Sequence, residues 1–260
     1  MGKIEAVVFD WAGTMIDYGC FAPLEVFLEI FRKRGVDVTV AEAREPMGMS
    51  KIEHIRTLCQ MPRIRQEWVN TYGKEPGEED VVKMFNDFEN ILFNLLPDFS
   101  TPIPGVLQLV ERLRERGIKI GSTTGYTKEM MDIVVPNARD KGYSPDCYVT
   151  ADDVKAGRPY PWMCYRNAME LDVYPMNRMI KAGDTPMDMI EGKNAGMWAV
   201  GVILGSSELA LSEEEVKQMD GPSLKLKMEA VRQRLIGAGA DFVIDRISDL
   251  DQVIDQIESL

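Results

Sequence analysis

The 260-residue sequence has little cysteine and only one histidine. Its four cysteines, Cys20, Cys59, Cys147 and Cys164, are scattered and form no Cys-x-x-Cys pair. The spacing therefore favours neither a disulfide framework nor a structural zinc site. This usage is typical of a protein of the reducing cytoplasm, which is the location that we expect.

Long apolar runs and an excess of basic residues are also missing. No stretch approaches the roughly 20 apolar residues that a membrane helix needs, and the first residues resemble a β-strand rather than a secretory signal. Lysine and arginine number 30 against 42 aspartates and glutamates, a formal net charge of −12. So acidic a chain lacks the basic surface that nucleic-acid binding requires. We therefore expect a small-molecule substrate, and neither a membrane nor a nucleic acid as partner.

Short apolar runs alternate with amphipathic helical stretches, a pattern typical of an α/β protein with a mainly parallel sheet. The expected strands are Ile4–Phe9, Ile118–Ser122, Cys147–Thr150, Met179–Ala182, Trp198–Ile203 and Phe242–Ile244. Several are continuous apolar runs, as strands covered by helices on both faces require. Apolar residues at helical spacing predict a helix over Gly105–Arg116.

Between about residues 21 and 99 the strand pattern disappears. Apolar residues recur at i, i+3, i+4 and i+7 over Leu24–Phe31, and a similar series runs over Met84–Leu95. The simplest interpretation is an all-helical cap domain, residues 21–99, inserted into a Rossmann-like core domain of residues 1–20 and 100–260. Two such units can close on a ligand that lies between them.

Two of the expected strands end in an aspartate. Asp10 follows the first strand in Phe9–Thr14, and Asp184 follows the fourth in Gly183–Met189. Open α/β sheets bind their ligands at the carboxyl ends of the strands, so we expect these carboxylates to lie together. Carboxylate oxygens suit a small, hard cation such as Mg²⁺.

The strand Ile118–Ser122 runs into hydroxyl side chains and Gly125 before the next helix. Side-chain hydroxyls and backbone N–H groups at a helix start can bind phosphoryl oxygens. Thr124 is the first candidate for this role, with Ser122 and Thr123 as rivals. Arg158, in Ala156–Pro159, supplies a fixed positive charge.

Asp-x-x-Gly-Thr, a strand-terminal threonine, a basic residue before proline and Gly-Asp-x-x-x-Asp occur in this order, and together they resemble the four motifs of the haloacid dehalogenase-like superfamily. The resemblance implies a hydrolase in which Asp10 attacks phosphorus and becomes a phosphoaspartate. It implies Mg²⁺ bound by Asp10, Asp184 and the backbone carbonyl of Ala12, with Asp188 orienting the metal shell. It further implies that the phosphoryl group is bound by Thr124, Gly125 and Arg158.

Ala12 departs from the pattern of the superfamily's phosphatases. These enzymes usually carry a second aspartate two residues after the nucleophile, which protonates the leaving oxygen and later activates water. A carbon leaving group has no ester oxygen to protonate and needs an electron sink instead. Ala12 therefore disfavours ordinary phosphate esters as substrates.

The segment Met47–His54 offers such a sink and contains the single histidine. We expect Ser50 to cap a helix here, with Glu53 completing a capping box, so that Lys51 and His54 share one helix face. A lysine amine can form an imine with an aldehyde, and a protonated imine accepts the electrons of a breaking carbon–phosphorus bond. His54 can carry protons near neutral pH.

Ala12, Lys51 and His54 together resemble a branch of the superfamily that hydrolyses the carbon–phosphorus bond of phosphonoacetaldehyde. This resemblance implies a homodimer joined through the helical caps, and further site residues at Cys20, Met47 and Tyr126. Because only a neutral amine attacks an aldehyde, we expect the pKa of Lys51 to lie below its usual value of about 10.4.

Other interpretations are open from the sequence alone. The fold could carry a phosphate-ester hydrolase or sugar-phosphate mutase, or a phosphate-binding protein without catalysis. Ala12 argues against the first, and the complete set of nucleophile, phosphate and metal motifs argues against the second. Lys51 could be one of the many solvated helix lysines, and His54 a structural histidine.

Overall fold

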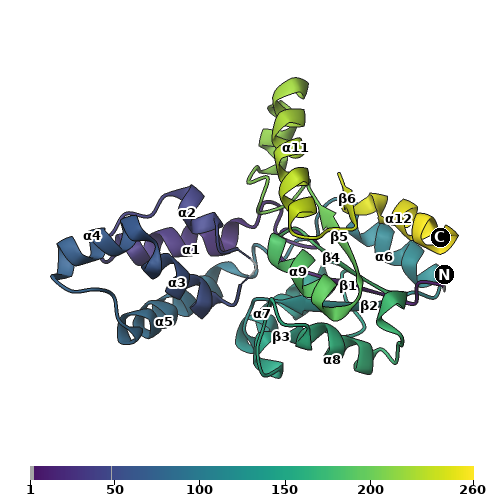
Figure 1. The fold of residues 1–260 in the computed structure, drawn as a ribbon, viewed down its shortest axis with the longest axis horizontal. Helices are drawn as coiled ribbons and strands as arrows, with labels where there is room; N and C mark the ends of the chain where they lie inside the picture. The colour runs from purple at the N-terminus through teal and green to yellow at the C-terminus, as the bar shows by residue number, and fades with distance from the viewer. Residues whose placement is uncertain (1–2, 48) are drawn as a thin grey trace.

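The computed structural model describes residues 3–47 and 49–260. Figure 1 shows two parts, a group of helices on the left and a sheet flanked by helices on the right, where both chain ends lie. The left-hand part consists of α1 (Phe21–Arg32), α2 (Val40–Arg44), α3 (Lys51–Gln60), α4 (Pro62–Tyr72) and α5 (Glu78–Leu95). We call these the helical segment.

The described residues form a sheet of six strands in the order β3-β2-β1-β4-β5-β6. The strands are β1 (Ala6–Phe9), β2 (Lys119–Thr124), β3 (Val149–Thr150), β4 (Met179–Gly183), β5 (Trp198–Val202) and β6 (Phe242–Ile244). Every neighbouring pair is parallel, which confirms the predicted α/β class. Each expected strand is present, with ends that differ by at most two residues, and Phe242–Ile244 has the expected bounds.

Alternating side chains of the strands pack against two different layers of helices. In β1, Val7 and Phe9 belong to one buried cluster, and Ala6 and Val8 belong to another. This alternation follows from the two-residue repeat of a strand. The covering helices are α6 (Val106–Glu115), α7 (Lys128–Asp140), α8 (Trp162–Glu170), α9 (Pro186–Ala195), α10 (Glu213–Gln218), α11 (Gly221–Gly237) and α12 (Leu250–Ser259).

The register of the three central strands places the sequence motifs at one edge of the sheet. Phe9 of β1 lies opposite Ser122 of β2 and Ala182 of β4. Because all three strands run in the same direction, the residues that follow, among them Asp10, Thr124 and Asp184, emerge at the same edge. The helical segment joins the chain directly after this edge, between β1 and α6.

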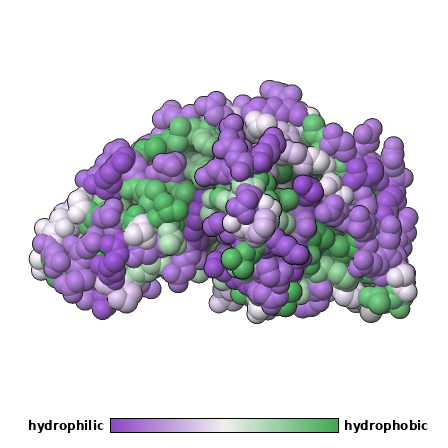
Figure 2. All heavy atoms as spheres, turned by 90° about the horizontal axis from the view of Figure 1, so that it is seen from above, coloured by the Kyte–Doolittle hydropathy of each residue, from purple (hydrophilic) through white to green (hydrophobic). Residues whose placement is uncertain are grey.

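Hydrophilic residues dominate the face in Figure 2, and hydrophobic residues gather there in smaller patches, one of them over the helical segment at the left. Among helices in the described part of the chain, none has the length and apolar composition of a membrane span. All four cysteines carry free thiols, as their scattered positions predicted.

Candidate active site

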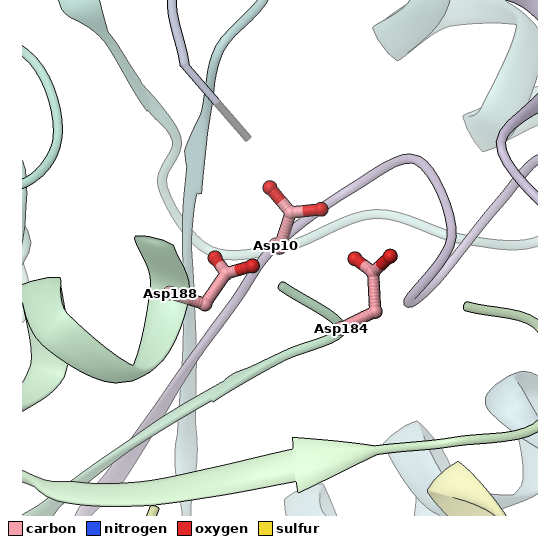
Figure 3. Close-up of side chains that lie close together, drawn as sticks. All are labelled: Asp10, Asp184 and Asp188. Carbon is pink, nitrogen blue, oxygen red and sulfur yellow. The ribbon is translucent and has the colours of Figure 1, made fainter. Parts of the chain in front are cut away.

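Three buried aspartates meet at the carboxyl edge of the sheet. Asp10 follows β1, Asp184 follows β4, and Asp188 lies in the first turn of α9. One oxygen from each lies within 4.8 Å of the other two, and Figure 3 shows the three carboxylates side by side. The sequence thus predicted correctly that Asp10 and Asp184 come together.

Asp184 is held by both of the loops that flank it. Its Oδ1 accepts a hydrogen bond from the Thr14 hydroxyl (3.0 Å), and its Oδ2 accepts from the Ser207 N–H (2.8 Å) and hydroxyl (2.7 Å). Gly13 has a φ of +88°, and a Cβ there would lie 2.6 Å from Asp184 Oδ2. Only glycine therefore permits this approach of the β1 loop to the carboxylate.

The charges of the cluster fit a divalent cation. Burial, together with the nearby charges of Asp10 and Asp188, raises the pKa of Asp184 to about 8. A cation bound to these oxygens would relieve that repulsion, because it stabilises the ionised carboxylates. The buried acids of the cluster are Asp10, Asp184, Asp188 and Glu191, and the buried bases that pair with them are Arg158 and Lys181. With the nearby Lys51 amine neutral, the excess of negative charge suits a divalent cation.

Arg158 lies between the Asp10 carboxylate and the interior of the protein. Its Nη2 donates to Asp10 Oδ1 (2.6 Å) and to the Thr123 hydroxyl (2.9 Å), and its Nε donates to Glu191 Oε2 (2.9 Å). Burial raises the pKa of Asp10 despite the opposing charge of Arg158. The other oxygen of Asp10 accepts no hydrogen bond from the described residues, so it is available to attack a substrate.

Asp188 has every oxygen engaged by the protein. Its Oδ1 pairs with Lys181 Nζ (2.7 Å) and Arg158 Nη2 (3.1 Å), and its Oδ2 accepts from the Thr185 hydroxyl (2.6 Å). Although burial alone would raise the pKa of Asp188, Arg158 and Lys181 lower it to about 2. Because both oxygens of Asp188 already have protein partners, this carboxylate suits the expected role of orienting the residues around the metal.

Several residues of this network were missed by the sequence reasoning, among them Lys181, Glu191 and Ser207. Lys181 is fully buried in β4, and Glu191 is fully buried on α9 three residues after Asp188. A lone lysine within an apolar strand, and an acid at helical spacing from Asp188, were signals that could have found them. Ser207 lies in the loop after β5, and no sequence pattern marks it.

A small cavity of about 20 Å³ lies beside the aspartates, under the helical segment. The predicted site residues that line it are Asp10, Ala12, Cys20, Met47, Lys51, Thr124, Gly125, Tyr126 and Arg158. Thr185 and Ser207, which were not predicted, also line it. Lys51, Gly125, Tyr126 and Arg158 contribute as well to a neighbouring cavity of about 1010 Å³ that opens toward solvent. The amine and the aspartate thus face one small cavity.

Among the three hydroxyl residues of β2, Thr124 is the one that lines the small cavity. Its Oγ1 accepts the Tyr126 N–H (3.0 Å), which leaves its own proton free to donate. Thr123 instead donates to Glu191 Oε2 (3.0 Å) and accepts from Arg158. Ser122 is buried, and its hydroxyl has no partner within the described chain. This geometry favours Thr124 as the phosphoryl ligand.

Lys51 begins α3 and is 5% exposed. Its Nζ lies 5.0 Å from the ring centroid of Tyr126 and 5.9 Å from that of Phe27, and no described residue forms a hydrogen bond with it. Burial lowers the pKa of Lys51, in the direction that the imine hypothesis predicted. The solvated-lysine interpretation is therefore wrong.

The predicted capping box at this helix start is also wrong. Ser50 does precede α3, but its side chain makes no capping hydrogen bond. Glu53 pairs with Arg56, and Arg56 also pairs with Glu78 of α5, so the glutamate turns outward instead of back to the helix start. Gly48, next to Met47 in the same motif, lies outside the described residues.

His54 lies one turn after Lys51 and is fully buried. Its ring stacks on Phe27 with centroids 3.7 Å apart, and its Nε2 lies 2.8 Å from the Ala43 carbonyl oxygen. Because a carbonyl only accepts, Nε2 must carry the proton, and Nδ1 has no partner in the described chain. Burial and the nearby Lys51 lower the pKa of His54 well below its usual value, so the ring is neutral. It does not appear among the described residues that line either cavity.

Comparison with known families agrees with this fold and site. The model of the haloacid dehalogenase-like hydrolases matches residues 4–196, which include β1, the helical segment and the strands up to α9. The chain therefore belongs to the haloacid dehalogenase-like hydrolases.

Curated relatives narrow the comparison. The phosphonoacetaldehyde hydrolases of Bacillus cereus (strain G9842) and Bacillus mycoides (strain KBAB4) are 63% and 64% identical to it over 98% of this chain and 97% of theirs. A crystal structure of a phosphonoacetaldehyde hydrolase-like protein from Oleispira antarctica has a TM-score of 0.97 and 40% identity, covering 99% of this chain and 94% of its own. Within its superfamily the chain is thus grouped with the phosphonoacetaldehyde hydrolases.

Proposed function

We propose that this protein hydrolyses phosphonoacetaldehyde to acetaldehyde and phosphate, with Mg²⁺ as its cofactor. The observation that carries the proposal is that Lys51 and Asp10 line the same small cavity. One supplies an amine for the aldehyde and the other a carboxylate for the phosphorus of a short two-carbon substrate. Ala12 agrees with this assignment, because a carbon leaving group needs no acid at that position.

The first step is imine formation on Lys51. Its burial favours the neutral amine, which adds to the aldehyde carbon to give a carbinolamine. The carbinolamine takes up a proton and loses water, leaving a protonated imine. The carbon attached to phosphorus is then adjacent to an electron-accepting C=N⁺ group. The Tyr126 ring lies 5.0 Å from the amine and stabilises the positive charge that the imine carries.

The second step is phosphoryl transfer to Asp10. The carboxylate oxygen that is not paired with Arg158 forms a bond to phosphorus while the carbon–phosphorus bond breaks. The bonding electrons move into the C=N⁺ group and give an enamine, so that no carbanion is released. Arg158, the Thr124 hydroxyl and the Gly125 N–H are positioned to stabilise the charge on the transferring phosphoryl oxygens.

Proton transfers and two hydrolyses complete the cycle. The enamine takes a proton on carbon, and water releases acetaldehyde and regenerates the Lys51 amine. A second water cleaves the phosphoaspartate to phosphate and free Asp10. We propose that the neutral His54 ring, whose Nδ1 has no partner within the described chain, accepts and returns protons through an intervening water, because the ring shares a helix with Lys51 but lines neither cavity.

We propose that Mg²⁺ is held by Asp10, Asp184 and the backbone carbonyl of Ala12, with Asp188 fixing the surrounding shell. The carboxylate cluster and its excess negative charge support this set. When bound, the cation neutralises charge at the phosphoryl group. We further propose the division into a cap (21–99) and a core (1–20 and 100–260), a cytoplasmic location, and a homodimer that pairs through the caps.

The direct test is the release of acetaldehyde and phosphate in equal amounts from phosphonoacetaldehyde in the presence of Mg²⁺. Lys51→Arg keeps the charge but cannot form an imine, and Asp10→Asn removes the nucleophile, so both variants should lose turnover while remaining folded. A phosphate-ester hydrolase would instead turn over p-nitrophenyl phosphate regardless of Lys51→Ala. That result, without activity on the phosphonate, would exclude the proposal.

A further inference from the structure

Arg44 connects the helical segment to the sheet edge that carries the aspartates. It is the last residue of α2, and its Nη1 donates to the Ser207 carbonyl (2.6 Å) and to the Gly19 carbonyl (3.2 Å). Its guanidinium carbon lies 5.3 Å from the ring centroid of Phe21, at the start of α1. One side chain of the helical segment thus binds both the loop after β5 and the linker before α1.

Ser207 connects Arg44 to Asp184, because it forms hydrogen bonds with both. The same residue whose carbonyl binds Arg44 uses its N–H (2.8 Å) and its hydroxyl (2.7 Å) to hold Asp184 Oδ2. The Arg44 side chain is therefore separated from a proposed metal-binding carboxylate by a single residue. A shift of Arg44 away from the loop would remove the contact that fixes Ser207 from outside.

The opposite side of α2 contacts the helix that carries the amine. The Ala43 carbonyl, adjacent to Arg44, accepts the His54 Nε2–H (2.8 Å), and Lys51 lies one turn before His54 on α3. The short helix α2 thus lies between the Lys51 helix and the Ser207 loop and has a hydrogen bond to each. It is the element through which the two halves of the site are held in a common geometry.

The Arg44 contacts are not those of an arginine placed for stability. Its Nε and Nη2 are buried and have no hydrogen-bond partner within the described chain. A buried donor without a partner costs free energy, and proteins tolerate such costs mainly at functional sites. A cavity of about 490 Å³ beside Arg44, between α2 and the Ser207 loop, lets water reach these nitrogens once the parts separate.

We propose that Arg44 is a positioning residue that couples closure of the helical segment over Lys51 to the placement of the Asp184 carboxylate. The inference rests on the proposed function. With Arg44 engaged, the amine and the metal-binding carboxylate are in their working positions together. With Arg44 released, the Ser207 loop loses its outer contact as the helical segment moves away.

The test compares Arg44→Met with Arg63→Met. Arg63 is a matched control, because its pairs with Glu42 and Glu67 lie entirely within the helical segment. Arg44→Met should lower kcat/KM for phosphonoacetaldehyde by about tenfold or more, since it removes hydrogen bonds from a charged donor. It should also raise the Mg²⁺ concentration needed for half-maximal activity, and speed amide hydrogen exchange over residues 205–209. Arg63→Met should change none of the three.

Arg44→Lys keeps one charged donor and should recover part of each effect, which separates positioning from a general loss of folding. The proposal is overturned if Arg44→Met leaves exchange over 205–209 and the Mg²⁺ requirement as in the unaltered protein. Failure of the proposed function looks different, because the unaltered protein would then release no acetaldehyde. If the unaltered protein releases no acetaldehyde, the role of Arg44 can still be tested. Hydrogen exchange over residues 205–209 and Mg²⁺ binding measured by calorimetry are then compared between the unaltered protein and Arg44→Met.

Discussion

At the scale of single residues, Lys181 shows how the site's charges are balanced. It lies in the middle of β4 with no exposed surface, and its Nζ is 2.7 Å from Asp188 and 3.8 Å from Glu191. A lysine in this position touches neither of the cavities of the site. Its effect on the chemistry is indirect, because its charge favours the ionised forms of Asp188 and Glu191, two carboxylates that pair with Arg158.

Replacing Lys181 with methionine should therefore destabilise the fold strongly. The change leaves two buried carboxylates short of a partner, and breaking a buried pair in this way costs about 3–5 kcal/mol. Urea unfolding measures the change in the free energy of unfolding. Lys193→Met is the control, because its pair with Asp241 is partly exposed and should contribute less than about 1 kcal/mol. Equal losses in the two variants would contradict this account of Lys181.

At the scale of elements, the strands were predictable and their ends were not. Apolar runs marked all six strands of the described sheet, because parallel strands are buried on both faces. The ends depend on pairing: β3 is limited to Val149–Thr150 because only these residues pair with Thr123 and Thr124 of β2. The Glu53 side chain pairs with Arg56 on its own helix, and Arg56 is held by Glu78 of α5, a tertiary contact that local sequence does not show.

The candidate site likewise combines residues whose position was predictable with residues whose position was not. Asp10, Thr124 and Asp184 end or follow strands, and Arg158 precedes a proline in a recognisable motif, so the meeting of these residues was predictable. Ser207 is brought to Asp184 by the path of a loop, and its position depends on contacts 23 residues apart in sequence. Such contacts arise from the assembled fold and have no local pattern.

The loop from β1 gives a prediction at this scale. Gly13→Ala adds a Cβ 2.6 Å from Asp184 Oδ2 and must displace that carboxylate. A displacement of about 1 Å at a catalytic centre can lower turnover about 100-fold. Gly73→Ala is the control: its φ is also positive, +71°, but nothing lies within 4 Å of the added carbon. Both should lose about 1 kcal/mol of stability from backbone strain, and only Gly13→Ala should lose turnover at saturating Mg²⁺. Normal turnover in Gly13→Ala would count against the assigned metal site.

At the scale of the whole molecule, Asp17 lies where the helical segment joins the sheet. Its N–H donates to the Thr101 carbonyl (3.3 Å) of the returning linker. Its carboxylate oxygens accept the N–H groups of Phe21 (3.1 Å) and Ala22 (3.2 Å), at the start of α1. One residue therefore ties both linkers to the first helix of the segment.

The titration of Asp17 should be visible in the stability of the metal-free protein. Burial raises its pKa from 3.8 to about 7, so the folded state binds the proton more tightly than the unfolded state. Its contribution to the free energy of unfolding therefore falls as pH rises from about 4 to about 7, and is constant above that. Asp17→Asn removes this dependence, so its stability relative to the unaltered protein should improve between about pH 5 and pH 8. Denaturant unfolding of both proteins at about pH 5 and about pH 8 measures this difference. An equal change in the free energy of unfolding for the two proteins would contradict the predicted titration of Asp17.

The proposed mechanism as a whole depends on a covalent bond between the Lys51 amine of the helical segment and the substrate. Borohydride reduces an imine to a stable secondary amine, so adding it to the enzyme with phosphonoacetaldehyde should fix a two-carbon adduct that intact-mass analysis and peptide mapping assign to Lys51. Lys51→Arg under the same conditions should acquire no adduct. If the unaltered enzyme turned over the substrate yet showed no mass increase on Lys51, the imine mechanism would be contradicted.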